Sequence, residues 1–345
     1  GRRLHLRWHY SRGSILQSNY SSATSPKSER TTFVPRGPVY INWNYTYACN
    51  FSCTHCYSRA NRYPRELSRQ QYIEIVEQLV DVGAFKVFLG GGEPFLRKDC
   101  LEVITRLSDK GLYAGVTTHG WWQDADLANK LKDAGLSRLL ISLDSADREK
   151  HDRFRRQPGS YDQVLKSSRA AVKAGLNIHF STVMSRMNMH EVEDVADLAE
   201  SLGVTGVEYK RFRPAGNGAL VKGALELSRS EVVEVRQQVK ALSERTSLET
   251  KFIYGEVPGD EGSCPCGVYS ICLRPNGDLS PCAYGDTVIG NMVETRLADL
   301  WKTSPHLQRI RKGGSCAALR VIPCPSNPLQ KTAGRTQRQI EIAAI

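Results

Sequence analysis

Short apolar runs and longer amphipathic segments alternate through the middle of the chain. The long segments carry apolar residues at helical spacing and end at a glycine, and runs rich in β-branched and aromatic residues follow them. The long segments predict helices, and the short runs predict strands. The predicted strands are Val39–Trp43, Phe85–Leu89, Tyr113–Thr117, Leu139–Leu143, Ile178–Val183 and Val207–Phe212.

The ends of several predicted helices are marked by specific residues. Glycine suits the left-handed position that ends a helix, and Ser followed three residues later by Gln or Glu has the form of a capping box. The predicted stop glycines are Gly83, Gly111, Gly135, Gly175 and Gly203. The predicted capping pairs are Ser68 with Gln71, Ser160 with Gln163, and Ser228 with Glu231.

Regular alternation of strand and helix predicts an α/β fold built on a parallel sheet. The strands are nearly all apolar, as expected for strands buried on both faces. Six units suit an open doubly wound sheet or a partial barrel, and in both the functional residues lie at the carboxyl ends of the strands. The unusual sequences occur at those ends: a cysteine segment, Gly90–Pro94, Thr118–Gly120, Asp144 and Arg213-Pro214.

Three cysteines with C-x3-C-x2-C spacing, Cys49, Cys53 and Cys56, follow the first predicted strand. Three thiolates can hold three irons of a [4Fe–4S] cube, which leaves the fourth iron open to a small molecule. The alternatives are a zinc knuckle, with His55 as a fourth ligand, or disulfides. Zinc sites usually carry four ligands in pairs, and His55 is awkwardly placed between two cysteines. The sequence therefore favours the iron–sulfur cluster.

The composition narrows the class of protein. The 345 residues suffice for one large domain and a smaller one, and no apolar run is long enough to span a membrane. The basic N-terminal segment lacks the apolar stretch of a secretory signal. Ten cysteines in such a chain indicate metal or redox chemistry in a reducing cytoplasm.

The net charge of +11 is concentrated in basic residues near the two ends. Such ends are usually solvated tails. The alternative is contact with an acidic partner, such as a peptide or a reductant protein. We expect no nucleic-acid partner, because no basic motif is interleaved with aromatic residues.

A second cysteine region lies beyond residue 220, after a polar helix predicted from Ser228 to about Leu242. It extends from Cys264 to Cys324. The pair Asn276-Gly277 predicts a hairpin turn, which would bring Cys264 close to Cys282. Cys100, on the helix that follows Glu93, is interpreted as a buried small apolar residue.

Four segments together resemble the radical S-adenosylmethionine (SAM) superfamily. They are the three-cysteine loop, Gly91-Gly92-Glu93-Pro94, Ser142-Leu143-Asp144 and His151-Asp152-Arg153-Phe154-Arg155. The resemblance covers residues 38–216 and implies a partial (β/α)6 TIM-like barrel. It implies an enzyme in which Cys49, Cys53 and Cys56 hold the cluster and SAM chelates the open iron. One electron then cleaves SAM, and the resulting 5′-deoxyadenosyl radical takes a hydrogen atom from the substrate.

The resemblance also implies contacts to SAM. Gly91 and Gly92 let the backbone approach closely, and Glu93 should bind the ammonium group. The backbone of His55 should lie near the adenine. Arg155 should pair with the SAM carboxylate, with a surface ion pair as the alternative.

Three further positions are implied at the ends of the next strands. Ser142 should contact SAM through its hydroxyl group. Asp144 is either a second cofactor contact or a helix cap. His119 departs from the family pattern, because Thr118-His119-Gly120 stands where Thr-Asn-Gly is usual. It is interpreted as a contact to cofactor or substrate, or as a structural residue. No catalytic side chain is assigned.

The second cysteine region resembles the opening of a SPASM or twitch domain, a small C-terminal cysteine-rich α+β module that holds auxiliary clusters. The predicted ligands of one auxiliary [4Fe–4S] cluster are Cys264, Cys282, Cys316 and Cys324, with Cys266 and Cys272 as substitutes. The alternative is a degenerate module without a cluster. The predicted boundaries are a basic segment 1–37, the barrel 38–220, a linking helix and connection 221–260, the module 261–325 and a polar tail 326–345.

Four further segments resemble mycofactocin and pyrroloquinoline-quinone maturases more weakly: Thr46–Cys49, Pro64–Ser68, the triple glycine Gly90–Gly92 and Arg211–Gly216. This weaker similarity suggests the substrate class. It favours a peptide or peptide-derived cofactor precursor, with oxidative decarboxylation, crosslinking or dehydrogenation as the reaction. A sugar, nucleoside or tetrapyrrole is the alternative substrate. A non-catalytic iron–sulfur or zinc scaffold is the alternative from another class. A ferredoxin or flavodoxin is the implied electron donor.

Overall fold

The computed structural model describes residues 34–58, 65–253 and 265–312. Their strands form a ten-stranded sheet in the order β10-β9-β8-β1-β2-β3-β4-β5-β6-β7. Neighbours from β8 through β1 to β7 pair in parallel, and β9 and β10 add an antiparallel edge. The strands are β1 (Tyr40–Thr46), β2 (Lys86–Gly91), β3 (Tyr113–Thr118), β4 (Arg138–Ser142), β5 (Ile178–Met184), β6 (Gly206–Arg211), β7 (Glu249–Ile253), β8 (Ser270–Leu273), β9 (Asp278–Ser280) and β10 (Gly290–Asn291).

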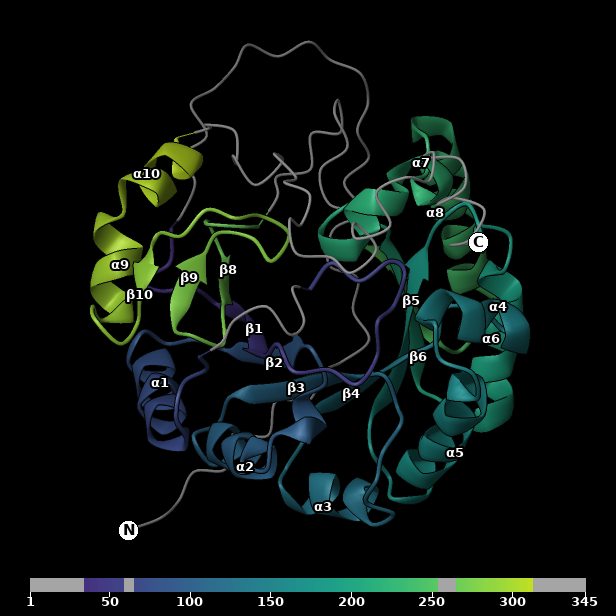
Figure 1. Cartoon of the computed structure of the whole chain (residues 1–345), viewed down its shortest axis with the longest axis horizontal. Helices are drawn as coiled ribbons and strands as arrows, with labels where there is room; N and C mark the ends of the chain where they lie inside the picture. The colour runs from purple at the N-terminus through teal and green to yellow at the C-terminus, as the bar shows by residue number, and fades with distance from the viewer. Residues whose placement is uncertain (1–33, 59–64, 254–264, 313–345) are drawn as a thin grey trace, which may run out of the picture. The chain divides into compact units, whose positions relative to one another are not determined.

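Helices cover the outer side of the curved sheet, where α1, α2, α3, α5 and α6 follow one another in Figure 1. The helices are α1 (Arg69–Asp81), α2 (Cys100–Asp109), α3 (Leu127–Asp133), α4 (Arg148–Arg155), α5 (Ser160–Lys173), α6 (Val192–Leu202), α7 (Lys222–Leu225), α8 (Arg229–Arg245), α9 (Leu297–Thr303) and α10 (Pro305–Arg311). Two 3-10 turns, Pro94–Leu96 and Gly216–Val221, follow β2 and β6.

All six predicted strands are present, and the predicted α/β partial barrel is confirmed. The sequence pattern missed β7, which lies within the predicted link 221–260. Its residues alternate between exposed and half-buried positions, so it lacks the apolar run by which the other strands were found. It pairs with β6 along the edge of the sheet, where one row of side chains can face water.

The predicted helix ends are mostly confirmed. The five stop glycines all have positive φ, and Ser68 and Ser228 form complete capping boxes. The prediction for Ser160 is wrong, because the N-cap of α5 is Gly159. The Ser160 hydroxyl instead donates to Asp152 Oδ1 at 2.8 Å. Asp152 also accepts the N–H groups of Gly159 and Tyr161, so this carboxylate satisfies the helix start that Ser160 was expected to cap.

Side chains on the strands alternate between an apolar outer face and a polar inner face. On β1, Ile41, Trp43 and Tyr45 belong to the main core together with Tyr72 of α1. On several strands, the alternate residues that face the inside of the barrel include charged side chains. The buried Glu208 on β6 meets Lys251 at 2.7 Å, Lys210 at 3.2 Å and Arg138 at 3.8 Å. The inner face of the barrel therefore carries a cluster of charged residues beside buried apolar residues such as Phe88 and Leu140.

The C-terminal strands extend the barrel sheet. β8 pairs in parallel with β1, and the predicted hairpin turn at Asn276-Gly277 joins β8 to β9. Gln78 of α1 holds the connection to α9: its amide donates to Met292 O, and its Oε1 accepts from Leu297 N–H. The module is thus attached to the barrel by a sheet ladder and a helix contact.

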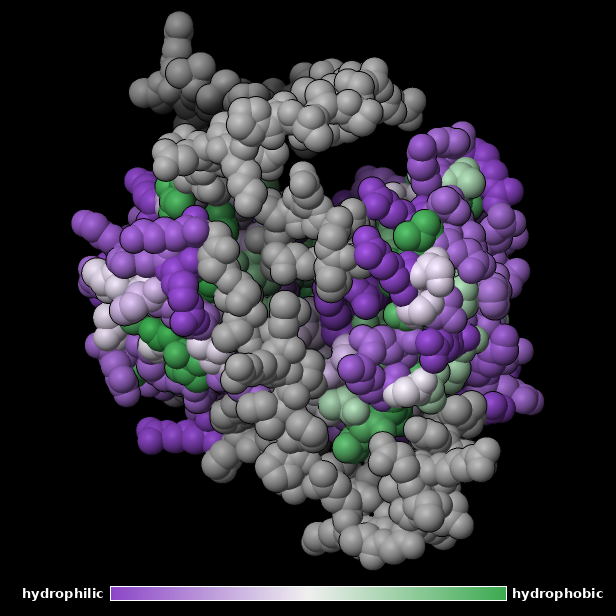
Figure 2. All heavy atoms as spheres, turned by 90° about the horizontal axis from the view of Figure 1, so that it is seen from above, coloured by the Kyte–Doolittle hydropathy of each residue, from purple (hydrophilic) through white to green (hydrophobic). Residues whose placement is uncertain are grey.

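The described surface seen in Figure 2 is mainly hydrophilic, with separate hydrophobic patches. This is the ordinary mixture at the exposed faces of amphipathic helices. Among the described helices, none combines the length and the apolar character needed to cross a membrane.

Candidate active site

The carboxyl ends of β1 to β4 bring the predicted site residues to one edge of the sheet. Because these strands are parallel and in register, the segments that follow them lie side by side. The cysteine loop follows β1, Glu93 follows β2, and His119 follows β3. Ser142 ends β4 and is buried.

The loop after β1 carries the three predicted cluster ligands, and no disulfide joins them. Cys53 is buried, while Cys49 and Cys56 are half-buried. Burial raises the pKa of the Cys49 and Cys56 thiols to about 12. The thiols are therefore protonated in the metal-free chain, so that binding iron must release protons.

The donor set of the loop is three thiols with one histidine among them. Three thiolates suit three irons of a [4Fe–4S] cube, whereas a structural zinc site usually takes four ligands. Three buried polar atoms in the loop, Thr54 Oγ1, His55 Nδ1 and Ser58 Oγ, have no hydrogen-bond partner among the described residues. Unsatisfied buried groups of this kind fit a loop that holds a bound group.

The start of the loop is fixed by Glu66, which the sequence analysis did not assign to the site. Glu66 accepts from Thr46 Oγ1 at 2.8 Å and from Tyr47 N–H at 2.7 Å. Arg97 holds Glu66 at 3.0 Å and Asp99 at 2.5 Å. The only sequence signal for Glu66 was its place in the family-like phrase Pro64–Ser68.

The end of the loop is held by Asn217, which lies in the 3-10 turn after β6. Its backbone N–H donates to Cys56 O at 2.8 Å, and its side-chain amide donates to Cys53 O at 3.3 Å. The preceding Gly216 is also required there, since a Cβ atom would lie 2.5 Å from Cys56 O. The cysteine loop is therefore clamped from both sides of the barrel.

Gly91 and Gly92 make room for the cysteine loop itself. Gly92 N–H donates to Thr46 O at 2.7 Å, and Glu93 N–H donates to Ala48 O at 2.8 Å. A Cβ on Gly91 would lie 2.5 Å from Thr46 O. The close approach at these glycines is to backbone of the same chain, and a cofactor contact for them stays a prediction.

We expect Gly92→Ala to disturb the loop strongly. The added Cβ would lie 2.1 Å from Ala48 O, a backbone atom that can move only with the loop. The cost should be about 1–3 kcal/mol in the free energy of unfolding, together with a several-fold loss of bound iron. Gly90→Ala is the matched control, because its nearest atom would be Thr117 Cβ at 3.9 Å. Urea unfolding and iron analysis measure both effects, and equal behaviour of the two variants would contradict this interpretation.

Glu93 is almost completely buried and is held by the segment after β3. Its carboxylate accepts from Thr118 Oγ1 at 2.9 Å, from His119 N–H at 3.0 Å and from Phe95 N–H at 3.3 Å. A carboxylate offers about four acceptor positions. One position is therefore left for a further donor, which fits the ammonium predicted there.

Arg155 is buried beside the cysteine loop, so the alternative that it forms a surface ion pair is wrong. Its Nε lies 2.6 Å from Asp144 Oδ2, and its Nη1 lies 3.9 Å from Cys53 Sγ. Burial opposes the charge of Asp144, but the Arg155 guanidinium outweighs it and lowers the pKa of the Asp144 carboxyl. The guanidinium has five donors, so its remaining N–H groups fit the predicted SAM carboxylate.

Asp144 is the counter-ion of Arg155 and caps none of the described helices. The N-cap of α4 is Asp147. Asp144 Oδ1 accepts from Val183 N–H at 3.0 Å, and Asp144 N–H donates to His151 Nδ1 at 3.2 Å.

His55 stacks on Phe154 with ring centroids 4.1 Å apart, and its Nε2 lies 3.6 Å from Asp144 Oδ2.

The His151 imidazole leads to a testable pH dependence. Burial lowers the pKa of His151 to about 4, and Arg155 adds to the shift. The unfolded histidine takes up a proton below about pH 6.5. The folded state resists that proton, so stability present above pH 6.5 is lost as the pH falls towards 4.

We expect His151→Asn to lose less stability over this pH range, by roughly 3 kcal/mol in the free energy of unfolding. Asparagine places an acceptor near the position of Nδ1 for Asp144 N–H but takes up no proton. Urea unfolding at several pH values measures the difference. Parallel pH curves for the two proteins would show that His151 does not cause the loss.

The second cysteine region is described only in part. Cys272 is buried on β8, and Cys266 and Cys282 are half-buried. Cys264, Cys316 and Cys324 lie outside the described residues, so the auxiliary ligand set stays a prediction. The two cysteine regions meet through their neighbours, because the Tyr57 ring, next to Cys56, lies 4.9 Å from the Tyr284 ring.

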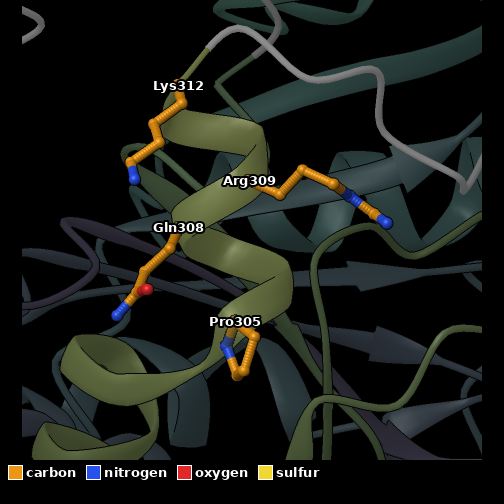
Figure 3. A pocket seen from close by; sticks show the side chains of 4 residues that line it. All are labelled: Pro305, Gln308, Arg309 and Lys312. Atoms are coloured by element: carbon orange, nitrogen blue, oxygen red, sulfur yellow. The ribbon is translucent and has the colours of Figure 1, made fainter.

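A separate hollow lies against α10. Figure 3 shows it lined by Pro305, Gln308, Arg309 and Lys312, whose polar side chains extend away from the helix. It contains none of the predicted site residues and no carboxylate or thiol, and we assign it no role in the chemistry.

Comparisons with known proteins agree with this geometry. A model of the radical SAM superfamily matches residues 43–199, and a model of the SPASM iron–sulfur cluster-binding domain matches residues 264–329. The AdoMet-dependent heme synthase of Nitratidesulfovibrio vulgaris is 27% identical over 296 residues, which cover 79% of this chain and 80% of that protein. The mycofactocin maturase MftC of Mycobacterium ulcerans is 29% identical over 310 residues, which cover 84% of each.

A solved structure shares the fold. Streptococcus suis SuiB, bound to its precursor peptide SuiA, superposes with a TM-score of 0.68 at 15% identity, covering 81% of this chain and 67% of SuiB. The chain therefore belongs to the radical SAM superfamily and is a radical SAM enzyme with a SPASM iron–sulfur cluster-binding domain.

Proposed function

We propose that the enzyme cleaves SAM reductively and takes a hydrogen atom from a peptide, or a peptide-derived cofactor precursor, that carries carboxylate groups. When bound, the cluster and SAM supply the 5′-deoxyadenosyl radical, which becomes 5′-deoxyadenosine on taking the hydrogen atom. Cys49, Cys53 and Cys56 hold the cluster in this proposal. Glu93 binds the SAM ammonium, and Arg155 binds the SAM carboxylate.

The observation that carries the substrate class is the charge on the inner face of the barrel, which extends from Arg138 and Glu249 at the starts of β4 and β7 to Lys210 near the end of β6. Arg138, Lys210 and Lys251 all surround one carboxylate, Glu208. Glu249 adds a second carboxylate, 3.0 Å from Arg138. These three cations outnumber the two carboxylates. The carboxylate group of a bound substrate would offset the excess positive charge.

Lys86 adds a further cation to this inner face. Among the described residues no carboxylate lies within ion-pair distance of its ammonium. It lies instead over the rings of Phe88 at 4.9 Å, Tyr113 at 5.0 Å and Tyr40 at 5.8 Å. Burial lowers the pKa of Lys86, and the neighbouring cations Lys251 and Arg138 add to the shift.

The similarity to a mycofactocin maturase supports a peptide as the carrier of the carboxylates. The similar identity to a heme synthase supports a second candidate, a tetrapyrrole with propionate groups. The same cations suit both compounds. A ferredoxin or flavodoxin as the electron donor, and a second cluster in the SPASM domain, stay predictions.

The test uses reconstituted enzyme with SAM and dithionite. Its probes are peptides with a free carboxyl terminus, the same peptides amidated, and an iron tetrapyrrole with propionates. Support for the peptide proposal would be 5′-deoxyadenosine formed in step with a peptide that loses two hydrogens or carbon dioxide. Modification of the tetrapyrrole alone would replace the peptide by the second candidate. If amidated and free peptides reacted equally, the role of the carboxylate would be wrong.

Lys210→Met tests the inner-face charges directly. We expect it to raise the KM for the carboxylate-bearing substrate while leaving cleavage of SAM without substrate unchanged. Lys240→Met, on the exposed side of α8, is the matched control. An unchanged KM in Lys210→Met would count against the proposed role of the inner face.

A further inference from the structure

We propose that His119 is a positioning residue that locks the cysteine loop to Glu93. Through this lock, the three-thiol site and the carboxylate keep one fixed separation. The inference deepens the proposed function and rests on it in one respect, namely that Glu93 binds the SAM ammonium.

The ring of His119 joins the cysteine loop to Glu93. Its Nε2 lies 2.8 Å from Asn50 Oδ1 and 3.3 Å from Glu93 Oε2. Its face stacks on Phe51, with centroids 4.0 Å apart and planes inclined by 6°. Asn50 and Phe51 both lie between the first two cysteines, so these contacts hold the part of the loop that separates Cys49 from Cys53.

The surroundings of the ring determine which nitrogen carries the proton. Trp121 N–H points to Nδ1 at 3.0 Å, so Nδ1 acts as the acceptor. Burial lowers the pKa of His119, which keeps the ring neutral. A neutral imidazole has one donor and one acceptor, so the donor is Nε2–H, which bonds Asn50 Oδ1 and leaves the fourth acceptor position of Glu93 open. The His119 backbone N–H adds a bond to Glu93 Oε2 at 3.0 Å.

The identity of residue 119 matters because its side chain must be long enough to bond Asn50 and must carry a planar ring to stack on Phe51. The asparagine usual at this position in the family is shorter and has no ring to stack on Phe51. Histidine here fills a site that is almost completely closed to solvent. It can thus hold the loop by a hydrogen bond and by ring packing at the same time.

The experiment compares His119→Ala, His119→Gln and His119→Asn in the full chain. Glutamine places an N–H donor near the position of Nε2, whereas asparagine reaches only to the position of Nδ1. We expect His119→Ala and His119→Asn to keep their iron but to raise the KM for SAM about tenfold, as expected for the loss of one hydrogen bond. His119→Gln should recover the part of the loss that is due to the hydrogen bond, but not the part that is due to stacking on Phe51. His190→Ala, an exposed histidine, is the matched control.

A second readout does not depend on SAM chemistry. In the metal-free chain, alkylation of Cys49 by iodoacetamide, mapped by mass spectrometry, should be about tenfold faster in His119→Ala if one hydrogen bond held the loop. Asn50→Ala should have a smaller effect in the same direction, because it leaves His119 stacked on Phe51. The double variant should add little to His119→Ala, because both changes remove the same hydrogen bond.

The outcomes separate the possible explanations. A wild-type protein that makes no 5′-deoxyadenosine would refute the proposed function, while a faster alkylation rate in His119→Ala would still support the lock. Unchanged alkylation in His119→Ala would overturn the lock whatever the activity. A merely structural role would lower stability and iron content alike in all three variants, without rescue by glutamine, and would also overturn it.

Discussion

Cys53→Ala is expected to abolish the formation of 5′-deoxyadenosine and to remove about four iron atoms per chain. Cys53 is the most buried of the three loop thiols, and the Arg155 guanidinium faces its sulfur. Without it, two thiolates remain for a cube that needs three protein ligands. The measurements are anaerobic reconstitution, iron analysis and chromatography of the products of SAM and dithionite.

Cys100→Ala is the matched control for this variant. Cys100 is equally buried but lies on α2, outside the loop. It should keep both its iron and its activity, and lose only the packing of one small side chain. If Cys53→Ala still produced 5′-deoxyadenosine at the wild-type rate, the assignment of the three-cysteine site would be wrong.

Arg155→Met is expected to lower the free energy of unfolding by about 3 kcal/mol, because it leaves the buried charge of Asp144 without its main partner. The lowered pKa of Asp144 means that this stabilisation is present above its unfolded pKa of about 3.9 and is lost as the pH falls further. Urea unfolding of the metal-free chain at neutral and acidic pH measures the difference.

The double variant Arg155→Met with Asp144→Asn separates stability from function. Removing both charges should restore much of the stability. It should not restore the cleavage of SAM, because no guanidinium remains for the carboxylate of the cofactor. A double variant with normal formation of 5′-deoxyadenosine would show that Arg155 serves only the fold.

Local patterns predicted the elements of the barrel well. Five glycines ended helices, and Ser68 and Ser228 capped them, because these interactions involve residues only a few positions apart. The prediction that Ser160 caps a helix was wrong for the opposite reason. Its hydroxyl donates to Asp152, eight positions away, and the position of Asp152 depends on how α4 packs against α5.

The sequence by itself determined the alternation of strand and helix, the three-thiol loop and the placement of polar residues at the strand ends. These features follow from the periodicity of side chains and from the number of donors that a cluster requires. Only the tertiary structure decided which distant groups meet. It paired β8 with β1 and formed the ion pair of Asp144 with Arg155. It also formed the hydrogen bonds of Glu66 to the start of the cysteine loop and of His119 to Asn50. Such contacts depend on strand order and register, and no short stretch of sequence contains that information.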